Sequence, residues 1–160
     1  MTDNDDIDII CTIISGSRIA VLTTVSEGGE LHSRPLGVLE GEFEGSVWFF
    51  TQDPSGKTAD VTADPQVNVS YTDGKSYLSL AGTATVEHNE TRIDQLWSPM
   101  VGAWFPDGKD DPSIALLRVD ASSAQFWAID KPAVVRLFEI AKGIVTKEQP
   151  DVGTNRAVDL

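Results

Sequence analysis

The sequence has little that would suit the cell exterior or a membrane. Its 160 residues include one cysteine, Cys11, which has no partner for an intramolecular disulfide. No apolar run reaches the roughly 18 residues that a transmembrane helix needs. Residues 1–6 are acidic and polar, unlike the start of a secretory signal. These absences predict a cytoplasmic protein with no membrane partner.

Positive charge is also scarce. The chain has 12 Lys and Arg against 25 Asp and Glu, which gives a formal net charge of −13, and it contains no run of basic residues. A surface of this kind repels nucleic acid and anionic lipid, so neither is an expected partner. A small anion is still compatible with it, because one or two well-placed cations and backbone N–H groups can hold a phosphate.

The residues that usually carry metal or nucleophilic chemistry are few. The only histidines are His32 and His88, and no zinc or calcium spacing surrounds them. The G-x-S-x-G elbow of the serine hydrolases is absent. Cys11 lies in an apolar helical pattern, which favours packing over reactivity. We therefore expect no metal site, and no catalytic residue can be identified.

What is present is a series of short strands joined by turns. Apolar residues make up 41% of the chain, and no linker divides it, so residues 1–160 are expected to form a single domain. The pattern predicts a mostly β fold, an antiparallel barrel of about six strands with peripheral helices. Strands are expected at 18–25, 31–39, 46–51, 66–71, 77–87 and within 114–129. Helices are expected at about 5–15, 55–63, 90–97 and 132–145. The last of these belongs to a C-terminal helix and tail at about 131–160, in which the polar segment 149–160 is expected to be a tail or an arm.

The start of the predicted helix at 55–63 has the chemistry of a phosphate cradle. Ser55 and Gly56 open the helix, and Lys57 adds a charge beside the free N–H groups of its first turn. The alternative is a capped surface helix with a solvated lysine. Gly56-Lys57-Thr58 also resembles the end of a P-loop, but Thr51 stands where the first glycine belongs and no parallel βαβ unit surrounds it. A nucleoside triphosphatase is therefore not expected.

The strand at 31–39 contains an unusual arginine. Alternation places His32, Arg34 and Leu36 on one face, and Pro35 predicts an edge strand or a bulge. Its backbone would then be free to meet a ligand. The alternative is a surface arginine paired with one of the many carboxylates.

Six segments carry a resemblance to a known family. They read AVLTTV at 20–25, HSRPL at 32–36, WFFT at 48–51 followed by Ser55-x-Lys57, YLSLAGTA at 77–84, LWxP at 96–99 with AWFPxG at 103–108, and QFW at 125–127. Together they resemble the FMN-binding split β-barrel superfamily typified by pyridoxamine 5′-phosphate oxidase, and most of all its bacterial general stress protein branch. The resemblance extends from about residue 18 to residue 130 and implies an antiparallel split β-barrel.

The resemblance also implies a flavin site. Arg34 and Lys57 would hold the FMN phosphate, and Trp127 would reach the cofactor from the second subunit of a homodimer that has flavin sites at its interface. Pro35 and Leu36 would lie along the flavin, and the backbone of Phe50 and Thr51 would line its ring. With the helix N-terminus included, the expected cofactor-binding residues are Arg34, Pro35, Leu36, Phe50, Thr51, Ser55, Gly56, Lys57 and Trp127.

The implied function is that of an FMN flavoprotein, an oxidoreductase of unknown small-molecule substrate. The alternatives are a non-catalytic flavin-binding general stress protein and a relative that binds a deazaflavin or haem. True pyridoxamine 5′-phosphate oxidases have a basic, histidine-containing segment after the tryptophan, whereas residues 128–132 here read AIDKP. Oxidation of that vitamin is therefore not expected.

Overall fold

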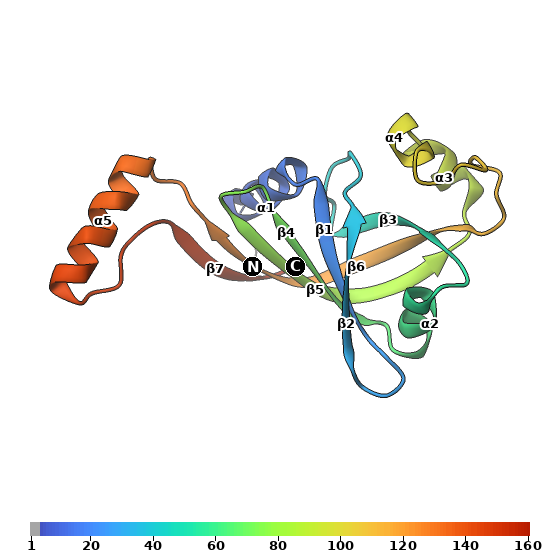
Figure 1. Cartoon of the computed structure of the whole chain (residues 1–160), viewed down its shortest axis with the longest axis horizontal. Coiled ribbons are helices and arrows are strands. Elements are labelled where there is room, and N and C mark those ends of the chain that lie inside the picture. Colours follow the sequence, from blue (N-terminus) through green and yellow to red (C-terminus); the bar gives the residue numbers. More distant parts are fainter. Residues whose placement is uncertain (1–3) are drawn as a thin grey trace.

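The structure, a computed structural model, describes residues 4–160 and is organised around one antiparallel sheet (Figure 1). The strand order is β2-β1-β4-β5-β6-β3, and β7 also pairs with β6. The predicted split barrel with peripheral helices is confirmed. The elements are α1 (Asn4–Gly16), β1 (Ile19–Val25), β2 (Leu31–Gly37), β3 (Ser46–Gln52), α2 (Gly56–Ala63), β4 (Gln66–Thr72), β5 (Tyr77–Glu87), α3 (Glu90–Leu96), α4 (Pro99–Gly102), β6 (Ile114–Ala128), α5 (Ala133–Thr146) and β7 (Thr154–Asp159).

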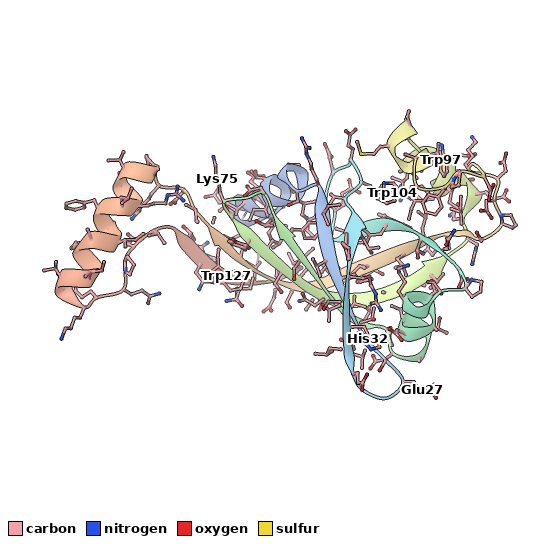
Figure 2. The ribbon with its side chains drawn as sticks, viewed as in Figure 1. Glu27, His32, Lys75, Trp97, Trp104 and Trp127 are labelled. Carbon is pink, nitrogen blue, oxygen red and sulfur yellow. The ribbon has the colours of Figure 1, made fainter. Side chains whose placement is uncertain are left out.

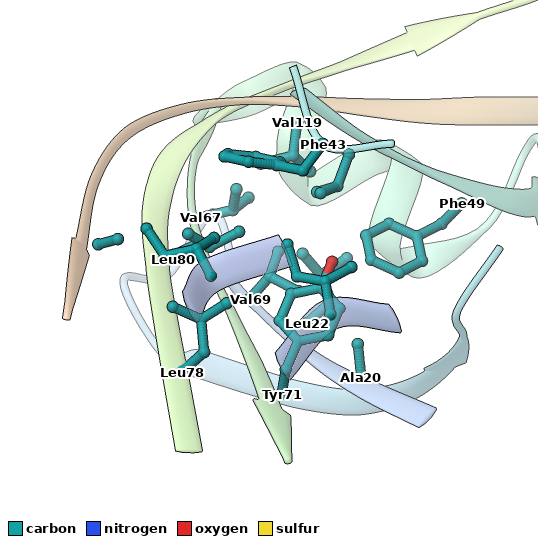
Figure 3. Packing of buried hydrophobic residues seen from close by; sticks show 14 of the residues in the cluster. Ala20, Leu22, Phe43, Phe49, Val67, Val69, Tyr71, Leu78, Leu80 and Val119 are labelled. Carbon is teal, nitrogen blue, oxygen red and sulfur yellow. The ribbon is translucent and has the colours of Figure 1, made fainter. Parts of the chain in front are cut away.

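The inner face of the curved sheet holds the core. Alternate residues of each strand point inward, among them Leu22, Phe49 and Leu80 (Figure 3). Helix α1 adds Ile10 and Ile13 to the same cluster, because its apolar residues recur at helical spacing and face the sheet. A second cluster lies beneath α3 and is formed by Ile93, Ile114 and Leu116.

The barrel is split between β2 and β3. These strands are the two ends of the strand order, and they lie close to each other without pairing. Pro35 lies in β2, as expected of a proline in an edge strand, because its missing N–H cannot serve a second neighbour. Two strand edges with unpaired backbone groups therefore face each other across the opening.

Gly82 allows the long strands β5 and β6 to bend. The pairing register shifts between Ala81 and Gly82, and a Cβ built on Gly82 would lie 2.2 Å from the carbonyl oxygen of Asp120. The prediction of a bulge or close backbone approach at this glycine is confirmed, since any other residue would collide with β6.

One part of the outer face of the sheet, formed by β2, β1, β4, the first residues of β5, the end of β6 and β7, is almost without charge, although the chain as a whole has 37 charged residues. Its one charged residue is Asp159, at the end of the last strand. Beyond the bulge at Gly82 the outer face carries Arg118 and Asp120 of β6, opposite Thr85 and Thr83. We call the part that is almost without charge the uncharged face. Its residues are Leu31, Ser33, Pro35 and Gly37 in β2; Ile19, Val21, Thr23 and Val25 in β1; Gln66, Asn68, Ser70 and Thr72 in β4; Tyr77, Ser79 and Ala81 in β5; Ser123, Gln125 and Trp127 in β6; and Asn155, Ala157 and Asp159 in β7.

The C-terminal segment differs from the expectation. Residues 149–160 were expected to be a polar tail or an arm, but they include β7, which pairs with the end of β6 and makes the sheet seven-stranded. Val158 alone of this strand is buried, so the strand lacks the alternating apolar pattern that would have predicted it. The preceding helix, α5, stands away from the barrel (Figure 1) and has no buried residue.

Candidate functional site

Helix α2 begins where β3 leaves the sheet, as predicted, and its first turn is tightly organised. The Ser55 hydroxyl accepts a hydrogen bond from the Thr58 N–H at 3.3 Å, and the Thr58 hydroxyl accepts one from the Ser55 N–H at 2.9 Å. This capping box uses the Ser55 side chain within the helix. The N–H groups of Gly56 and Lys57 are left without an intrahelical acceptor and remain the donors for a ligand.

Lys57 extends from α2 to the neighbouring strand. Its Nζ donates a hydrogen bond to the buried Thr51 hydroxyl at 3.0 Å. Burial lowers the pKa of Lys57, and the nearby charge of Arg34 lowers it further. Among residues 4–160, Lys57 forms no ion pair with a carboxylate. A half-buried cation repelled by a second cation is stabilised when an anion binds beside it.

Arg34 points from β2 toward the same helix. Its guanidinium donates to the Thr24 hydroxyl at 2.5 Å and to Asp60 Oδ2 at 3.2 Å, and its side chain is 22% exposed. The alternative expectation, that Arg34 pairs with a carboxylate, is thus confirmed by its contact with Asp60. The arginine nevertheless lies near Lys57, so the pairing does not exclude a ligand-binding role.

Asp60 is the residue that organises this cluster, which we call the β2–α2 cation site: Arg34, Lys57, Asp60 and Thr24. A hydrogen bond from Thr24 holds the pKa of Asp60 below its ordinary value, and Arg34 and His32 act in the same direction against the effect of burial. The carboxylate therefore stays ionised and fixes the guanidinium.

The sequence did not single out Asp60 or Thr24 as part of the site. A signal for Asp60 exists, because it follows Lys57 by three residues and so shares a helix face with it. Thr24 pairs with His32 across the β1–β2 hairpin, so its position depends on strand register. His32, which was placed on the same strand face as Arg34, lies 3.6 Å from Asp60 through Nδ1.

A second acid–histidine contact flanks α2 on its other side. Asp53, in the loop before the helix, lies 2.8 Å from Nε2 of His88, which follows β5. This hydrogen bond, and another with Thr58, lower the pKa of Asp53. Both histidines of the chain therefore contact acidic groups near α2, although they are 56 positions apart in the sequence.

The other expected residues are more dispersed. Leu36 packs against the core, and Pro35 lies on the uncharged face. The ring of Phe50 points the other way from Thr51 and packs against Trp97 and Phe105, with centroids 5.7 and 6.1 Å away. Only the backbone of residues 50–51, at the free edge of β3, is available to a ligand in the opening.

Trp127 lies apart from the β2–α2 cation site. It pairs with Tyr77 on the uncharged face and is 39% exposed. Four steps in the strand order separate its strand β6 from β2, and Arg34 points to the opposite face of the sheet. Figure 2 shows Trp127 toward the α5 side of the sheet and His32 in the β1–β2 hairpin beside α2. Trp127 and Arg34 therefore cannot contact one small molecule bound to a single chain.

The arrangement is suited to holding an anionic group and not to a metal ion. Two cations, two free N–H groups and a helix N-terminus converge on one place. In the described part of the chain, no group of three or more His, Cys, Asp or Glu residues is placed to hold a metal. None of the helices within residues 4–160 combines the length and hydropathy of a membrane-spanning segment.

Comparisons with known proteins agree with the fold. Residues 5–151 match the model of the family described as pyridoxamine 5'-phosphate oxidase like. Protein bli-3 of Neurospora crassa is 26% identical over 164 residues, which cover 95% of this chain and 78% of that protein.

Two solved structures are similar over most of their length. A protein described as general stress protein 26 from Jannaschia sp. CCS1 has a TM-score of 0.79 at 25% identity, covering 99% of this chain and 100% of that one. The general stress FMN/FAD binding protein from Xanthomonas citri has a TM-score of 0.71 at 29% identity, covering 81% and 93%.

Proposed function

This chain belongs to the pyridoxamine 5′-phosphate oxidase-like family, and on that premise we propose that it is a flavoprotein that binds FMN at the β2–α2 cation site. The observation that carries the proposal is the half-buried Lys57, which lies close to Arg34 and has no carboxylate partner within residues 4–160. The solved relative from Xanthomonas citri, described as FMN/FAD binding, supports a flavin as the ligand class.

The FMN phosphate would be held by Lys57, Arg34 and the N–H groups of Gly56 and Lys57. A phosphate monoester carries up to two negative charges, which match two cations and a helix N-terminus. Ser55 contributes by fixing the turn, since its hydroxyl already caps the helix. Asp60 would keep the guanidinium of Arg34 oriented while the phosphate binds its other side.

The flavin ring would lie in the opening between β2 and β3. The backbone of Phe50 and Thr51 at the free edge of β3 offers hydrogen-bond groups to the polar edge of the ring, and Pro35 and Leu36 follow Arg34 on β2. The flavin, when bound, supplies the electron or hydride chemistry, and the protein supplies binding and orientation. The substrate and the electron donor are not specified by these residues.

We further propose that the protein is a homodimer with a flavin site at each end of the interface. The uncharged face supports this, because a sheet surface nearly free of charge in a chain of net charge −13 is suited to burial. The position of Trp127 also supports it. This residue lies on the uncharged face, four steps in the strand order from β2 and its Arg34, so it reaches a flavin only at the site of a second copy.

Oxidation of pyridoxamine 5′-phosphate is not part of the proposal. That substrate brings a second phosphate, which needs cations beyond Arg34 and Lys57. The nearest cation after Trp127 is Lys131, and its Nζ already lies 2.5 Å from Asp151 Oδ2. A non-catalytic flavin-binding protein remains the alternative function, and turnover with reduced nicotinamide and an electron acceptor distinguishes it from an oxidoreductase.

The first test is reconstitution of the purified full chain with FMN, followed by its visible spectrum and sedimentation. The proposal expects a bound oxidised-flavin spectrum and a dimer at micromolar concentration. A haem or deazaflavin spectrum in the protein as isolated would contradict the assignment of FMN. A monomer in the presence of FMN would contradict the dimer.

A further inference from the structure

A cavity of about 750 Å³ lies where the loop 38–45 joins β2 to β3. Val38, at the start of the loop, and Val47, near the start of β3, both line it. Trp48 lines it as well, and because neighbouring residues of a strand point to opposite faces, the cavity extends around the free edge of β3. Thr51, which accepts the hydrogen bond of Lys57, lies four residues after Val47, roughly 13 Å along the strand. The cavity is therefore separate from the β2–α2 cation site.

The inner wall of the cavity is apolar, because it belongs to the main core. Figure 3 shows three of its residues, Phe43, Phe49 and Tyr71, which come from the loop, β3 and β4. Ile14 of α1 and Val47 complete this wall. The Tyr71 hydroxyl is the only polar side-chain atom among these five residues.

The hydroxyl of Tyr71 lacks a partner. The residue is only 3% exposed, yet its hydroxyl forms no hydrogen bond with any group in residues 4–160. Burial raises the pKa of Tyr71, so the hydroxyl stays protonated at neutral pH and can donate. A buried donor without an acceptor costs free energy, which a bound acceptor would recover. A water molecule is a poor substitute, because a buried water usually makes about three hydrogen bonds and the inner wall offers one polar side chain.

The outer wall of the cavity is charged. Its charged residues are Glu40, Glu42, Glu44, Glu87, Arg92 and Arg118. Arg118 already contacts Asp120 at 2.9 Å and Glu87 at 3.8 Å. The guanidinium of Arg92 lies 4.7 Å from the ring centre of Trp48. Four glutamates against two arginines give this wall a net negative charge, which repels an anionic ligand. The inner wall disfavours a charge of either sign, because a charged group would lose its hydration there.

We propose that this cavity binds an uncharged, mainly apolar molecule with a hydrogen-bond-accepting oxygen, such as an aryl ketone, and that the Tyr71 hydroxyl donates to this oxygen. The volume lies in the range of about 300–1,000 Å³ that is typical of small-molecule sites. Phe43 anchors the loop in the core with 9% exposure, so the cavity is formed before the ligand binds. None of the described residues that line the cavity is expected to hold the flavin, so the inference does not depend on the proposed flavin site.

The test compares benzophenone, an uncharged aryl ketone, with diphenylmethane, which has the same two rings and no oxygen. Equilibrium dialysis with the full chain in excess measures the affinity of both probes for the wild type, Tyr71→Phe and Tyr77→Phe. Tyr77 is the only other tyrosine of the chain and is exposed on the uncharged face, so its variant is the matched control. Tyr71→Phe should weaken benzophenone by about tenfold, because the carbonyl loses its donor, and should leave diphenylmethane unchanged. Tyr77→Phe should match the wild type for both probes.

The site of binding is checked by irradiation, since benzophenone forms covalent bonds to nearby C–H groups in near-ultraviolet light. Peptide mass spectrometry of the wild type should find the label in residues 38–49. Val38→Phe, which narrows the cavity, should weaken both probes together and tests the cavity independently of Tyr71. Benzoylbenzoate, which adds a carboxylate, should bind more weakly than benzophenone.

Four results would overturn the inference. They are the absence of saturable benzophenone binding up to about 0.5 mM, an equal effect of Tyr71→Phe on both probes, labelling confined to the uncharged face, and tighter binding of benzoylbenzoate. A chain that binds benzophenone as expected but not FMN would support the cavity and overturn the proposed flavin site. A chain that binds FMN but not benzophenone would do the reverse.

Discussion

Helices α2 and α5 were both predicted from periodicity, yet they relate to the rest of the molecule in opposite ways. Helix α2 has eight residues, a complete capping box and two buried side chains, Thr58 and Val61. Helix α5 has 14 residues, no side-chain cap at Pro132 and no buried residue. The shorter helix is held by its own chain, whereas the longer one presents the larger apolar surface to solvent.

The difference separates two uses of an amphipathic pattern. In α2 the buried side anchors the helix to the core, which leaves Lys57 and the N-terminal N–H groups at the opening of the barrel. In α5 the polar side contacts the chain and the apolar side has no partner within residues 4–160. Periodicity predicts a helix in both cases, but only the orientation shows whether the partner belongs to the same chain.

The largest expected effect comes from breaking the anchor of α2. Val61 is 3% exposed in the main core, so Val61→Asp buries an unpaired charge and should cost about 4 kcal/mol or more of unfolding free energy. The matched change on α5, Val134→Asp, should alter the unfolding of the barrel by less than about 0.5 kcal/mol. Urea denaturation at protein concentrations that dissociate a dimer measures both. Equal losses would show that α5 is packed on its own barrel.

Removal of the cation carried by α2 should weaken the ligand and spare the fold. Lys57→Ala should reduce FMN affinity by about 1.5–3 kcal/mol, the range of a charge-assisted hydrogen bond. Titration of FMN fluorescence measures the change, and Lys75→Ala, in the β4–β5 hairpin, is the control. A loss of the same size in Lys75→Ala would show that only the overall charge matters.

Breaking the capping box of α2 should have a smaller effect than Val61→Asp has on stability or Lys57→Ala has on FMN affinity. Ser55→Ala removes the hydroxyl that accepts the Thr58 N–H, and should lower the unfolding free energy by about 1 kcal/mol. FMN affinity should fall only slightly, because Ser55 shapes the turn and makes no direct ligand contact in this account. A loss of FMN affinity as large as that of Lys57→Ala would give the hydroxyl a direct role.

The smallest effect is a pH dependence in the β2–α2 cation site. The pKa of Asp60 is lowered in the folded chain, so its contribution to stability is complete above the unfolded value of about 3.9 and is lost as the pH falls below it. Asp60→Asn should therefore reduce the slope of unfolding free energy against pH below about pH 4. An unchanged slope would show that Asp60 is not held ionised by Thr24 and Arg34.

Much of the fold follows from local patterns in the sequence. The turns at Gly28-Gly29 and Asp73-Gly74 define two hairpins, and Pro65 marks the end of α2. Strand β7 could not be predicted from such a pattern, because Thr154, Asn155 and Arg156 are polar and the strand forms only by pairing with β6. The orientation of α5 could not be predicted either, because the periodicity identifies the apolar face of the helix but does not show whether that face points toward the barrel or toward solvent.

The candidate site was predictable to a similar extent. Lys57 and Arg34 were identified by residue type and local position, and the structure brings them to one place. Asp60 and Thr24 were not identified, since their contacts depend on how α2 packs beside β1 and β2. Site residues can be predicted from the sequence when neighbouring residues along the chain form the site. They cannot be predicted when tertiary packing brings them together.

The central claim is that α2 and β2 together form a site for a flavin phosphate. The most direct measurement compares the affinities of FMN and riboflavin for the wild type and for Lys57→Ala, since the two ligands differ only in the phosphate. The account predicts that the wild type binds FMN more tightly by about tenfold or more, the equivalent of one charge-assisted hydrogen bond, and that Lys57→Ala loses most of this preference. Equal affinity of the wild type for the two ligands would contradict the claim.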